Sequence, residues 1–370
     1  MNKICLVAAM MSATSATAGG WEASRLDTSF MYQKGNYGEV SYAPITYDVT
    51  GSAFNGATHV NRKTAKDQTR AAVSFKTSYE DFDVGLTRFN SATIQMSGGA
   101  ATFGTAGGTW VPDADMPQTT TSLIGKYGVS DNLGILLGVN RNTLAKSFVT
   151  TIVGRYDIDA ASSTGTVMGV VYSKPEIALR VELLSQPKST ITSNTKLTIS
   201  TVGAATPYNG ANVASFNSKA SLPDRLTLNF QSGIAEDTLL YGSIHQAKWA
   251  TAQITVPTGL ATTSVSSSFT DTTDYSLGVA RKMSDSLVVT GSLNHASGSG
   301  KTGTSLFTMS NGHIGASLGA LYTFDKFTVS GGYSFTRIGG VKITPAGQSN
   351  YAQYGGNSVS AFALKIGVSF

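Results

Sequence analysis

Two arginines lie in apolar stretches where a bound anion could reach them. Arg180 stands in IALRVELL (177–184), and Arg225 begins RLTLNFQSG (225–233), where apolar and polar residues alternate. In an extended chain alternate side chains point to opposite faces, so each arginine shares its face with polar neighbours. A guanidinium beside an apolar slot can bind the carboxylate of an amphiphile. The alternative is structural, with Arg180 paired to an acid such as Glu182.

Residues suited to covalent or metal chemistry are few. The histidines are at 59, 245, 295 and 313, and the only cysteine is Cys5. A hydrolase would need a Ser–His pair, but serines are so numerous that such a pair arises easily by chance. His295 and His313 could pair on a metal, yet they lack a carboxylate or thiol nearby in the sequence. His245 is expected to be solvated. We therefore expect no enzymatic activity, no cofactor and no resident metal.

The alternation around the arginines recurs along the chain and predicts fourteen strands. They are expected at 38–49, 70–79, 83–90, 119–128, 133–142, 166–173, 177–184, 225–233, 238–249, 274–282, 287–296, 313–324, 327–336 and 357–370. Tight turns alternate with long loops, which are expected roughly at 50–69, 91–118, 143–165, 185–224, 250–273, 297–312 and 337–356. Pro44 interrupts the first strand and marks an edge or a bulge.

The composition does not fit a helical membrane protein or an ordinary soluble domain. The chain is 41% hydrophobic and 13% charged, against about 25% charged in soluble domains. No apolar run beyond the N-terminus is long enough for a transmembrane helix. An even number of strands, with short turns at one end and long loops at the other, predicts an all-β fold, a 14-stranded antiparallel transmembrane β-barrel. Aromatic residues near strand ends would form its interfacial girdles: Tyr79, Tyr127, Tyr172, Trp249, Tyr322, Phe324, Phe327 and Phe370.

The N-terminus predicts the compartment. In MNKICLVAAMMSATSATAGG a lysine, an apolar stretch and small residues follow each other in the order of a signal peptide, assigned to 1–18. Residues 19–37 then form a short N-terminal hatch segment, and 38–370 form the barrel. The protein is expected in the outer membrane of a Gram-negative bacterium. The formal net charge of +5 is too small to indicate nucleic acid as a partner.

The hatch segment is too apolar for a free periplasmic tail. Its apolar residues, among them Phe30, need cover. They could lie in the barrel lumen as a plug, or they could pack at the barrel mouth as a structural lid. Phe30 and Arg25 are candidate ligand contacts in the first case.

Three stretches resemble the long-chain fatty-acid transporter (FadL) family of outer-membrane proteins. They are GNYGEVSYAPITYDVTGS (35–52), KPEIALRVELLSQPKSTI (174–191) and LPDRLTLNFQSGIAEDTLLYGSIHQAKW (222–249). The resemblance implies a monomeric barrel of fourteen strands for passive uptake of hydrophobic small molecules, either long-chain fatty acids or related hydrocarbons. It also implies a lumen blocked by the N-terminal segment and a sideways exit at a kinked strand. The segment here is short and lacks the Asn-Pro-Ala stretch of many members.

The long loops carry further candidate contacts. Phe103 and Trp110, in 91–118, could form an outer landing site for ligand, or could only pack the loops together. Arg62, Lys63 and Lys66 could bind lipopolysaccharide phosphates, or could form a solvated face. The alternative function is a general diffusion porin for hydrophilic solutes, with a wet lumen and usually a trimeric assembly.

Overall fold

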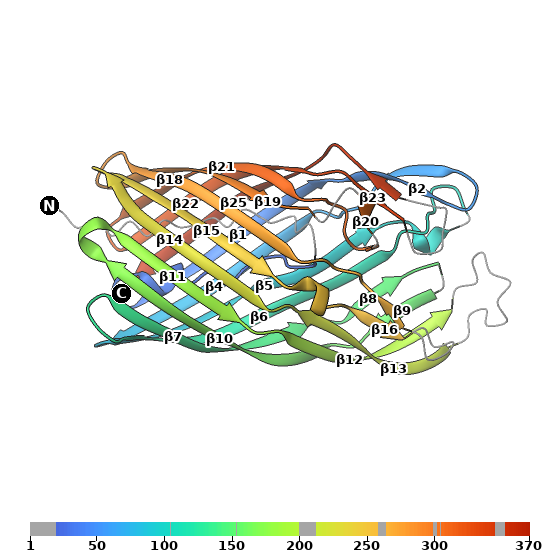
Figure 1. Ribbon diagram of the computed structural model, residues 1–370, viewed down its shortest axis with the longest axis horizontal. Coiled ribbons are helices and arrows are strands. Elements are labelled where there is room, and N and C mark those ends of the chain that lie inside the picture. The colour runs from blue at the N-terminus through green and yellow to red at the C-terminus, as the bar shows by residue number, and fades with distance from the viewer. Residues whose placement is uncertain are drawn as a thin grey trace.

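The structure, a computed structural model, describes residues 20–103, 105–152, 154–199, 212–257, 264–298, 302–303, 305–344 and 352–370. The predicted signal peptide, 1–18, lies outside these residues. Fourteen long strands form one closed antiparallel barrel (Figure 1). They are β1 (Tyr37–Asp48), β4 (Gln68–Tyr79), β5 (Phe82–Ser97), β6 (Asp113–Gly128), β7 (Leu133–Leu144), β10 (Ala161–Lys174), β11 (Leu179–Gln186), β14 (Arg225–Ala235), β15 (Thr238–Ala247), β18 (Thr272–Lys282), β19 (Leu287–Ala296), β21 (His313–Phe324), β22 (Phe327–Ile338) and β25 (Asn357–Ser369).

Pairing of the first strand with the last closes the barrel. β1 pairs with β4 on one side and with β25 on the other, from Tyr37↔Ser369 to Asp48↔Ser358. The remaining strands pair in chain order, so none of the fourteen leaves an open edge. The predicted fold and all fourteen predicted strands are confirmed. Several strands are longer than predicted, most of all β5, followed by β6 and β10.

The long connections gather at one end of the barrel and contain more strands than the sequence predicted (Figure 1). β8 (Ser147–Thr150), β9 (Gly154–Ile158), β12 (Ser189–Ile199), β13 (Asn212–Leu222), β16 (Thr255–Pro257) and β17 (Ser264–Ser266) extend the barrel sheet beyond its rim. β2 (Thr50–Phe54), β3 (His59–Lys63), β20 (Thr302–Gly303), β23 (Val341–Ile343) and β24 (Ala352–Tyr354) form a second, five-stranded sheet. We call this end the loop end and the opposite one the turn end.

The two faces of the wall differ in chemistry. Large apolar side chains such as Leu137, Leu277, Leu318 and Phe362 point outward and are exposed, as expected of a surface that faces lipid. Many polar side chains point inward and are buried. The predicted girdle position of Trp249 is wrong, because this ring is fully buried in the short 3-10 helix η4 (Trp249–Thr251) and touches Gly20.

Among the residues that the structure describes, helical structure is confined to single turns. Besides η4 these are η1 (Ser29–Tyr32), η2 (Ala100–Thr102) and η3 (Pro175–Ile177). In the described part of the chain, no helix has the length and apolar character needed to cross a membrane.

Candidate functional site

A bulge in β5 binds the N-terminal segment to the inner wall. The register of β5 against β6 shifts between Asn90 and Ala92, which takes Ser91 out of the ladder. The Ser91 carbonyl accepts a hydrogen bond from the Ala23 amide at 2.8 Å, and the Thr93 amide donates to the Trp21 carbonyl, also at 2.8 Å. The indole of Trp21 donates to the Ser221 carbonyl at 3.1 Å. The segment is therefore fixed to the wall through its main chain and one aromatic side chain.

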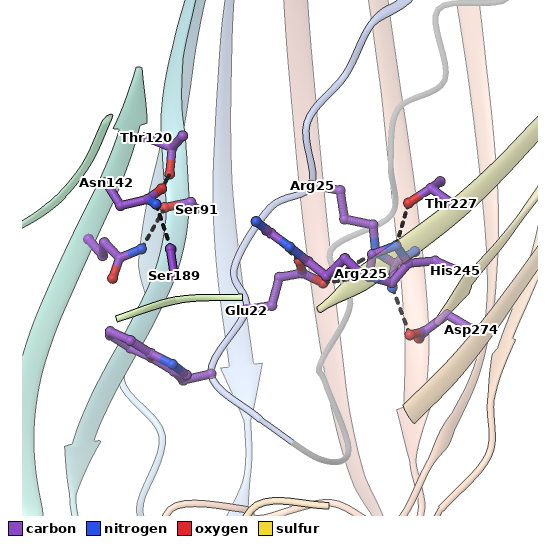
Figure 2. Close-up of polar contacts among 12 residues, drawn as sticks. Glu22, Arg25, Ser91, Thr120, Asn142, Ser189, Arg225, Thr227, His245 and Asp274 are labelled. Carbon is purple, nitrogen blue, oxygen red and sulfur yellow. Dashed lines mark hydrogen bonds and ion pairs between the residues drawn. The ribbon is translucent and has the colours of Figure 1, made fainter. Parts of the chain in front are cut away.

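A buried ionic cluster holds the same segment to the other side of the barrel (Figure 2). Glu22 lies 3.3 Å from Arg225 of β14, 3.2 Å from Nε2 of His245 of β15, and 3.4 Å from Arg25. Arg25 also lies 2.8 Å from Asp274 of β18. The side chains of Glu22, Arg225 and His245 are at most 4% exposed. We call these five residues the lumen cluster.

A second polar network lies on the β5 side of the segment (Figure 2). Thr120 donates to Asn142 at 2.7 Å, and Asn142 donates to Ser189 at 2.8 Å. Gln118 donates to the hydroxyl of Ser91 at 3.3 Å, so the residue that binds the segment is itself positioned by β6. The segment is thus held between two buried polar groups of opposite walls.

The charges of the segment depend on these contacts. Burial by itself raises the pKa of the Glu22 carboxyl, but His245, Arg25 and Arg225 outweigh burial, and the pKa lies well below its ordinary value. Burial likewise opposes ionisation of Asp27, and the ion pair with Lys365 and hydrogen bonds from Ser29 lower its pKa overall. Both carboxylates are therefore charged when the segment is in place.

Further along the segment, residues 27–32 contact β11 and β25. Glu182 of β11 accepts hydrogen bonds from Thr28 at 2.7 Å, from Asn229 at 2.8 Å, and from the Tyr32 hydroxyl. Burial, together with the negative charge of Glu182, raises the pKa of the Tyr32 phenol, so it remains a donor. Lys365 of β25 bridges Asp27 at 3.0 Å and Glu39 at 3.1 Å.

The structure places the predicted arginines inside the barrel, against the segment. Arg180 lies over the Tyr32 ring, 4.1 Å from its centroid, and Arg225 and Arg25 belong to the lumen cluster. Phe30 is fully buried next to Gly85 of β5. Arg180 and Arg225 thus contact the segment, to which Arg25 and Phe30 themselves belong. Of the four residues only Arg25 lines either of the two pockets found in the barrel.

The structure places the histidines differently from what the sequence predicted. The prediction of a solvated His245 is wrong, because the ring is buried between Glu22 and Thr227, whose hydroxyl lies 2.8 Å from Nδ1. His313 points inward and is buried, whereas His295 points outward and is exposed, so the two cannot share a metal. Among the described residues, no group of three or more His, Cys, Asp or Glu side chains could hold a metal ion.

A pocket with a mixed polar and apolar lining lies at the loop end, against Trp21 and Glu22 of the segment. Trp21, Met96, Phe307, Met309 and Ile338 form its apolar lining, and its polar residues include Glu22, Gln68, Gln95 and Arg70. We call it the loop-side pocket. Phe103 and Trp110 lie outside it: Trp110 is buried in the large apolar cluster at the loop end, and Phe103 packs against that cluster.

A second pocket passes through the barrel wall. It is lined by inward residues such as Asp27, Ser74 and Lys365, and also by Tyr42 and Tyr333, which are on the outer face. The β1–β25 ladder pairs Tyr42 with Leu364 and resumes at Ile45↔Ala361, so Ala43 and Pro44 are skipped. Proline has no amide hydrogen to donate, which accounts for the interruption there. We call this the wall pocket.

Arg70 of β4 is the one side chain of high basicity that lines both pockets. Its guanidinium donates to the Ala23 carbonyl, to the Tyr47 hydroxyl at 3.0 Å and to Gln68 at 3.5 Å, all of them neutral acceptors. Arg70 is not among the candidate residues expected from the sequence. The signal was present, because Ala71, Val73 and Phe75 alternate outward and leave Arg70 on the inner face.

Solved structures with the same fold include several channels. A Pseudomonas aeruginosa FadL homologue has a TM-score of 0.72 and 13% identity, with 92% of each chain covered. The Pseudomonas putida toluene transporter TodX has a TM-score of 0.65 and 14% identity over 91% of each chain. The Ralstonia pickettii toluene transporter TbuX has a TM-score of 0.60 and 11% identity over 94% of this chain and 95% of that one. The chain thus has the FadL-type barrel fold. No family profile and no curated protein matches its sequence.

Proposed function

We propose that this protein is a monomeric channel of the Gram-negative outer membrane that takes up hydrophobic small molecules passively. One observation carries the proposal: a segment bound inside the barrel lies between a partly apolar pocket at the loop end and a pocket whose lining residues come from both faces of the wall. The barrel fold shared with hydrocarbon and fatty-acid transport proteins supports it. The three named neighbours are transporters or a transporter homologue, and we infer no catalytic step.

The two pockets suggest a route. An apolar molecule arriving among the loops would enter the loop-side pocket, where Met96, Phe307 and Met309 offer flexible apolar contacts. It would pass Arg70, which lines both pockets, and leave between β1 and β25 at Pro44. Tyr42 and Tyr333 are outside that opening, so the molecule would move directly into lipid without crossing water.

A diffusion porin is less compatible with the contacts of the segment. A porin conducts through an aqueous lumen, whereas here Trp21, Phe30 and Met31 are buried inside the barrel and Glu22 is in a dehydrated ionic cluster. The segment 19–37 therefore acts as a plug in this proposal, and the lumen cluster and the Tyr32–Glu182 contact keep it in place.

The cargo would be an apolar molecule of the hydrocarbon or long-chain fatty-acid type. The loop-side pocket supplies apolar surface, and Arg70 supplies a cation bound only to neutral groups in the described contacts. A carboxylate would form a stronger, charge-assisted bond with Arg70 than the carbonyl and hydroxyl that it now contacts. A neutral hydrocarbon would pass without that interaction.

Deletion of residues 19–34 tests whether the segment is a plug, and lipid extraction of the intact protein tests the class of cargo. We expect single-channel conductance in planar bilayers to rise from little steady current to a large open-channel current, and lipid extracts of the intact protein to contain fatty acid or hydrocarbon by mass spectrometry. The full-length protein from the same preparation is the control. Large steady conductance of the full-length protein without bound lipid would instead identify a porin.

A further inference from the structure

Two arginines point outward from the barrel wall in a single row. Arg88 of β5 is opposite Thr121 of β6, and Thr121 is opposite Arg141 of β7. Both arginines are exposed. Because one strand separates them and neighbouring strands are about 4.8 Å apart, their Cα atoms lie about 10 Å apart.

On β5, β6 and β7 the row is at the loop-end boundary of the apolar surface, whereas on the β4 side Arg88 is paired with apolar Val73. The outward row toward the turn end is Leu86, Leu123, Val139 and Thr166, and the outward row toward the loop end is Asn90, Thr119, Thr143 and Ser162. The arginine row itself continues to Thr164 of β10. Within two residues along each strand, the outward side chains therefore change from mostly apolar to hydroxyl, amide and cationic groups. The arginine row and the row nearer the loop end contain no Asp or Glu.

Both guanidinium groups lean away from the apolar surface. Arg88 donates to Thr121 at 3.4 Å and to Thr119 at 3.3 Å, and Arg141 donates to Ser162 at 3.3 Å. Thr119 and Ser162 belong to the row nearer the loop end. Within the described part of the chain, all these acceptors are neutral and neither arginine forms an ion pair. Long cationic side chains at a membrane orient in this way, toward the headgroup layer.

The cost of an outward charge fixes the level of this row in the bilayer. A lipid-facing Arg in a barrel costs about 2–4 kcal/mol at the midplane and close to zero at the interface. The loop end faces outward in the proposed function, because long loops are extracellular in outer-membrane barrels. Arg88 and Arg141 then lie at the headgroups of the outer leaflet.

We propose that Arg88 and Arg141 form a binding site for the phosphate groups of lipopolysaccharide on the outer wall of β5, β6, β7 and β10. Two arginines whose Cα atoms lie about 10 Å apart can each bind one phosphate of a doubly phosphorylated sugar headgroup, and the surrounding hydroxyls add donors. The acyl chains of the same lipid would pack on Leu86, Leu123 and Val139. The proposal rests on the outer-membrane location in the proposed function and not on its cargo.

The site differs from the one that the sequence suggested. Of the three cations predicted to bind lipopolysaccharide in the first loop, Arg62 donates to the Gly107 carbonyl and Lys63 forms an ion pair with Asp67 at 3.0 Å. These contacts occupy both side chains within the protein. In the described contacts no acidic group compensates the charges of Arg88 and Arg141. These two arginines are therefore better placed to bind an anion than Arg62 and Lys63.

The test compares lipid retention by the full chain and its variants. Wild type, Arg88→Gln/Arg141→Gln and Arg281→Gln are purified from outer membranes in mild detergent, and bound lipopolysaccharide is counted by native mass spectrometry. Arg281 is the matched control, because it also points outward but lies at the turn end. Delipidated samples are then titrated with lipopolysaccharide, with its dephosphorylated form and with inorganic phosphate.

We expect lipopolysaccharide affinity to fall about 10-fold for each arginine removed, as for loss of one charge-assisted hydrogen bond. Arg281→Gln should bind like wild type, and dephosphorylated lipid should bind all three proteins equally weakly. Equal affinity of the double variant and wild type would overturn the proposal, as would inorganic phosphate binding as tightly as the lipid.

Arg88→Lys/Arg141→Lys, which keeps the charge, shows whether any loss reflects misfolding. Hydrocarbon uptake by the double variant should be unchanged. The lipid titration therefore tests the lipopolysaccharide site, and the uptake assay tests the transport function independently.

Discussion

Glu22 and Arg225 are 203 positions apart in the chain, yet Oε1 of one lies 3.3 Å from Nη1 of the other in the interior of the barrel. The pair connects the N-terminal segment to β14, and through His245 and Asp274 the same cluster reaches β15 and β18. Glu22 is therefore the acid that three basic side chains contact, and Arg225 depends on it for charge compensation, whereas Arg25 also pairs with Asp274.

Replacement of Glu22 by Ala should destabilise the protein by about 3 kcal/mol, because it leaves buried Arg225 without its carboxylate. Equilibrium unfolding by guanidinium in detergent micelles measures the change. Lys63→Ala is the control: its ion pair with Asp67 has side chains 48% and 54% exposed, and the change should cost at most about 1 kcal/mol. Equal values for the two variants would show that Glu22 contributes no more than a surface charge.

Acid should release the segment. The pKa values of Glu22 and Asp27 lie below 4.5 and 3.8 when the segment is bound, so their ionised forms favour binding. This contribution is complete at neutral pH and is lost as the pH falls below 4.5 and 3.8 through the lowered pKa values. Fluorescence of Trp21, in a variant with Trp110→Phe and Trp249→Phe, should shift to longer wavelength over that range.

The acid transition has a matched control. In Glu22→Gln/Asp27→Asn, carried on the same Trp21 background, neither carboxyl titrates, and the pH-dependent shift should disappear. Arg225, His245 and Lys365 face these carboxyls from the barrel strands, Arg25 faces Glu22 from the segment itself, and all four are present in both proteins. A shift of the same size in the control would assign the transition to the barrel itself, which circular dichroism follows independently.

Arg70 should discriminate charged from neutral cargo. In Arg70→Gln we expect the affinity for a long-chain carboxylate to fall about 10-fold, through loss of one charge-assisted bond, while the affinity for an uncharged hydrocarbon stays the same. Ligand titration followed by intrinsic fluorescence measures both. Arg180→Ala/Arg225→Ala, which disturbs contacts to the segment, should weaken both ligands equally. An equal loss for both ligands in Arg70→Gln would leave Arg70 with a structural role only.

A disulfide across the interrupted ladder should block sideways release. Ala43 would be opposite Ala363 if the β1–β25 register continued through the gap, and both line the wall pocket. Cα atoms directly opposite in antiparallel strands lie about 4.5–5.5 Å apart, within disulfide range. Oxidised Ala43→Cys/Ala363→Cys should lose hydrocarbon uptake into liposomes and regain it on reduction.

The disulfide experiment needs a control on the same pair of strands. Val40 and Ile366 are directly paired on the outer face, away from the skipped residues. A disulfide formed there should leave uptake intact. Uptake that persists in the oxidised Ala43–Ala363 variant would rule out this gap as the exit.

Period-two alternation was sufficient to predict the barrel because it is a local property. The last strand was expected at 357–370 and is β25, Asn357–Ser369, and its apolar outer face was evident from Phe362, Leu364 and Ile366. The prediction for β5 ended at 90 because the bulge between Asn90 and Ala92 moves later residues to the other face. The alternation breaks there in the sequence, although the strand continues to Ser97.

The interior contacts were largely beyond reach of the sequence. Arg180 and Arg225 were correctly expected to share a face with Glu182 and Asn229, but their actual partners, Tyr32 and Glu22, come from a distant segment. His245 follows an ambiguous alternation, and only the path of Glu22 makes it a buried residue. No local pattern encodes which wall a segment meets after it enters a closed barrel.

The lumen cluster also has a consequence for the order of folding. Residues 20–32 leave the ribosome before the barrel strands, but the partners of Glu22 are at 225 and 245, and Lys365, which binds Asp27, is in the last strand, β25. The barrel closes only when β25 pairs with β1, where the Phe370 amide binds the Asn36 carbonyl. A segment synthesised ahead of every barrel strand is thus among the last to reach its native position, and an apolar stretch with Trp21, Phe30 and Met31 needs a chaperone's protection during that interval.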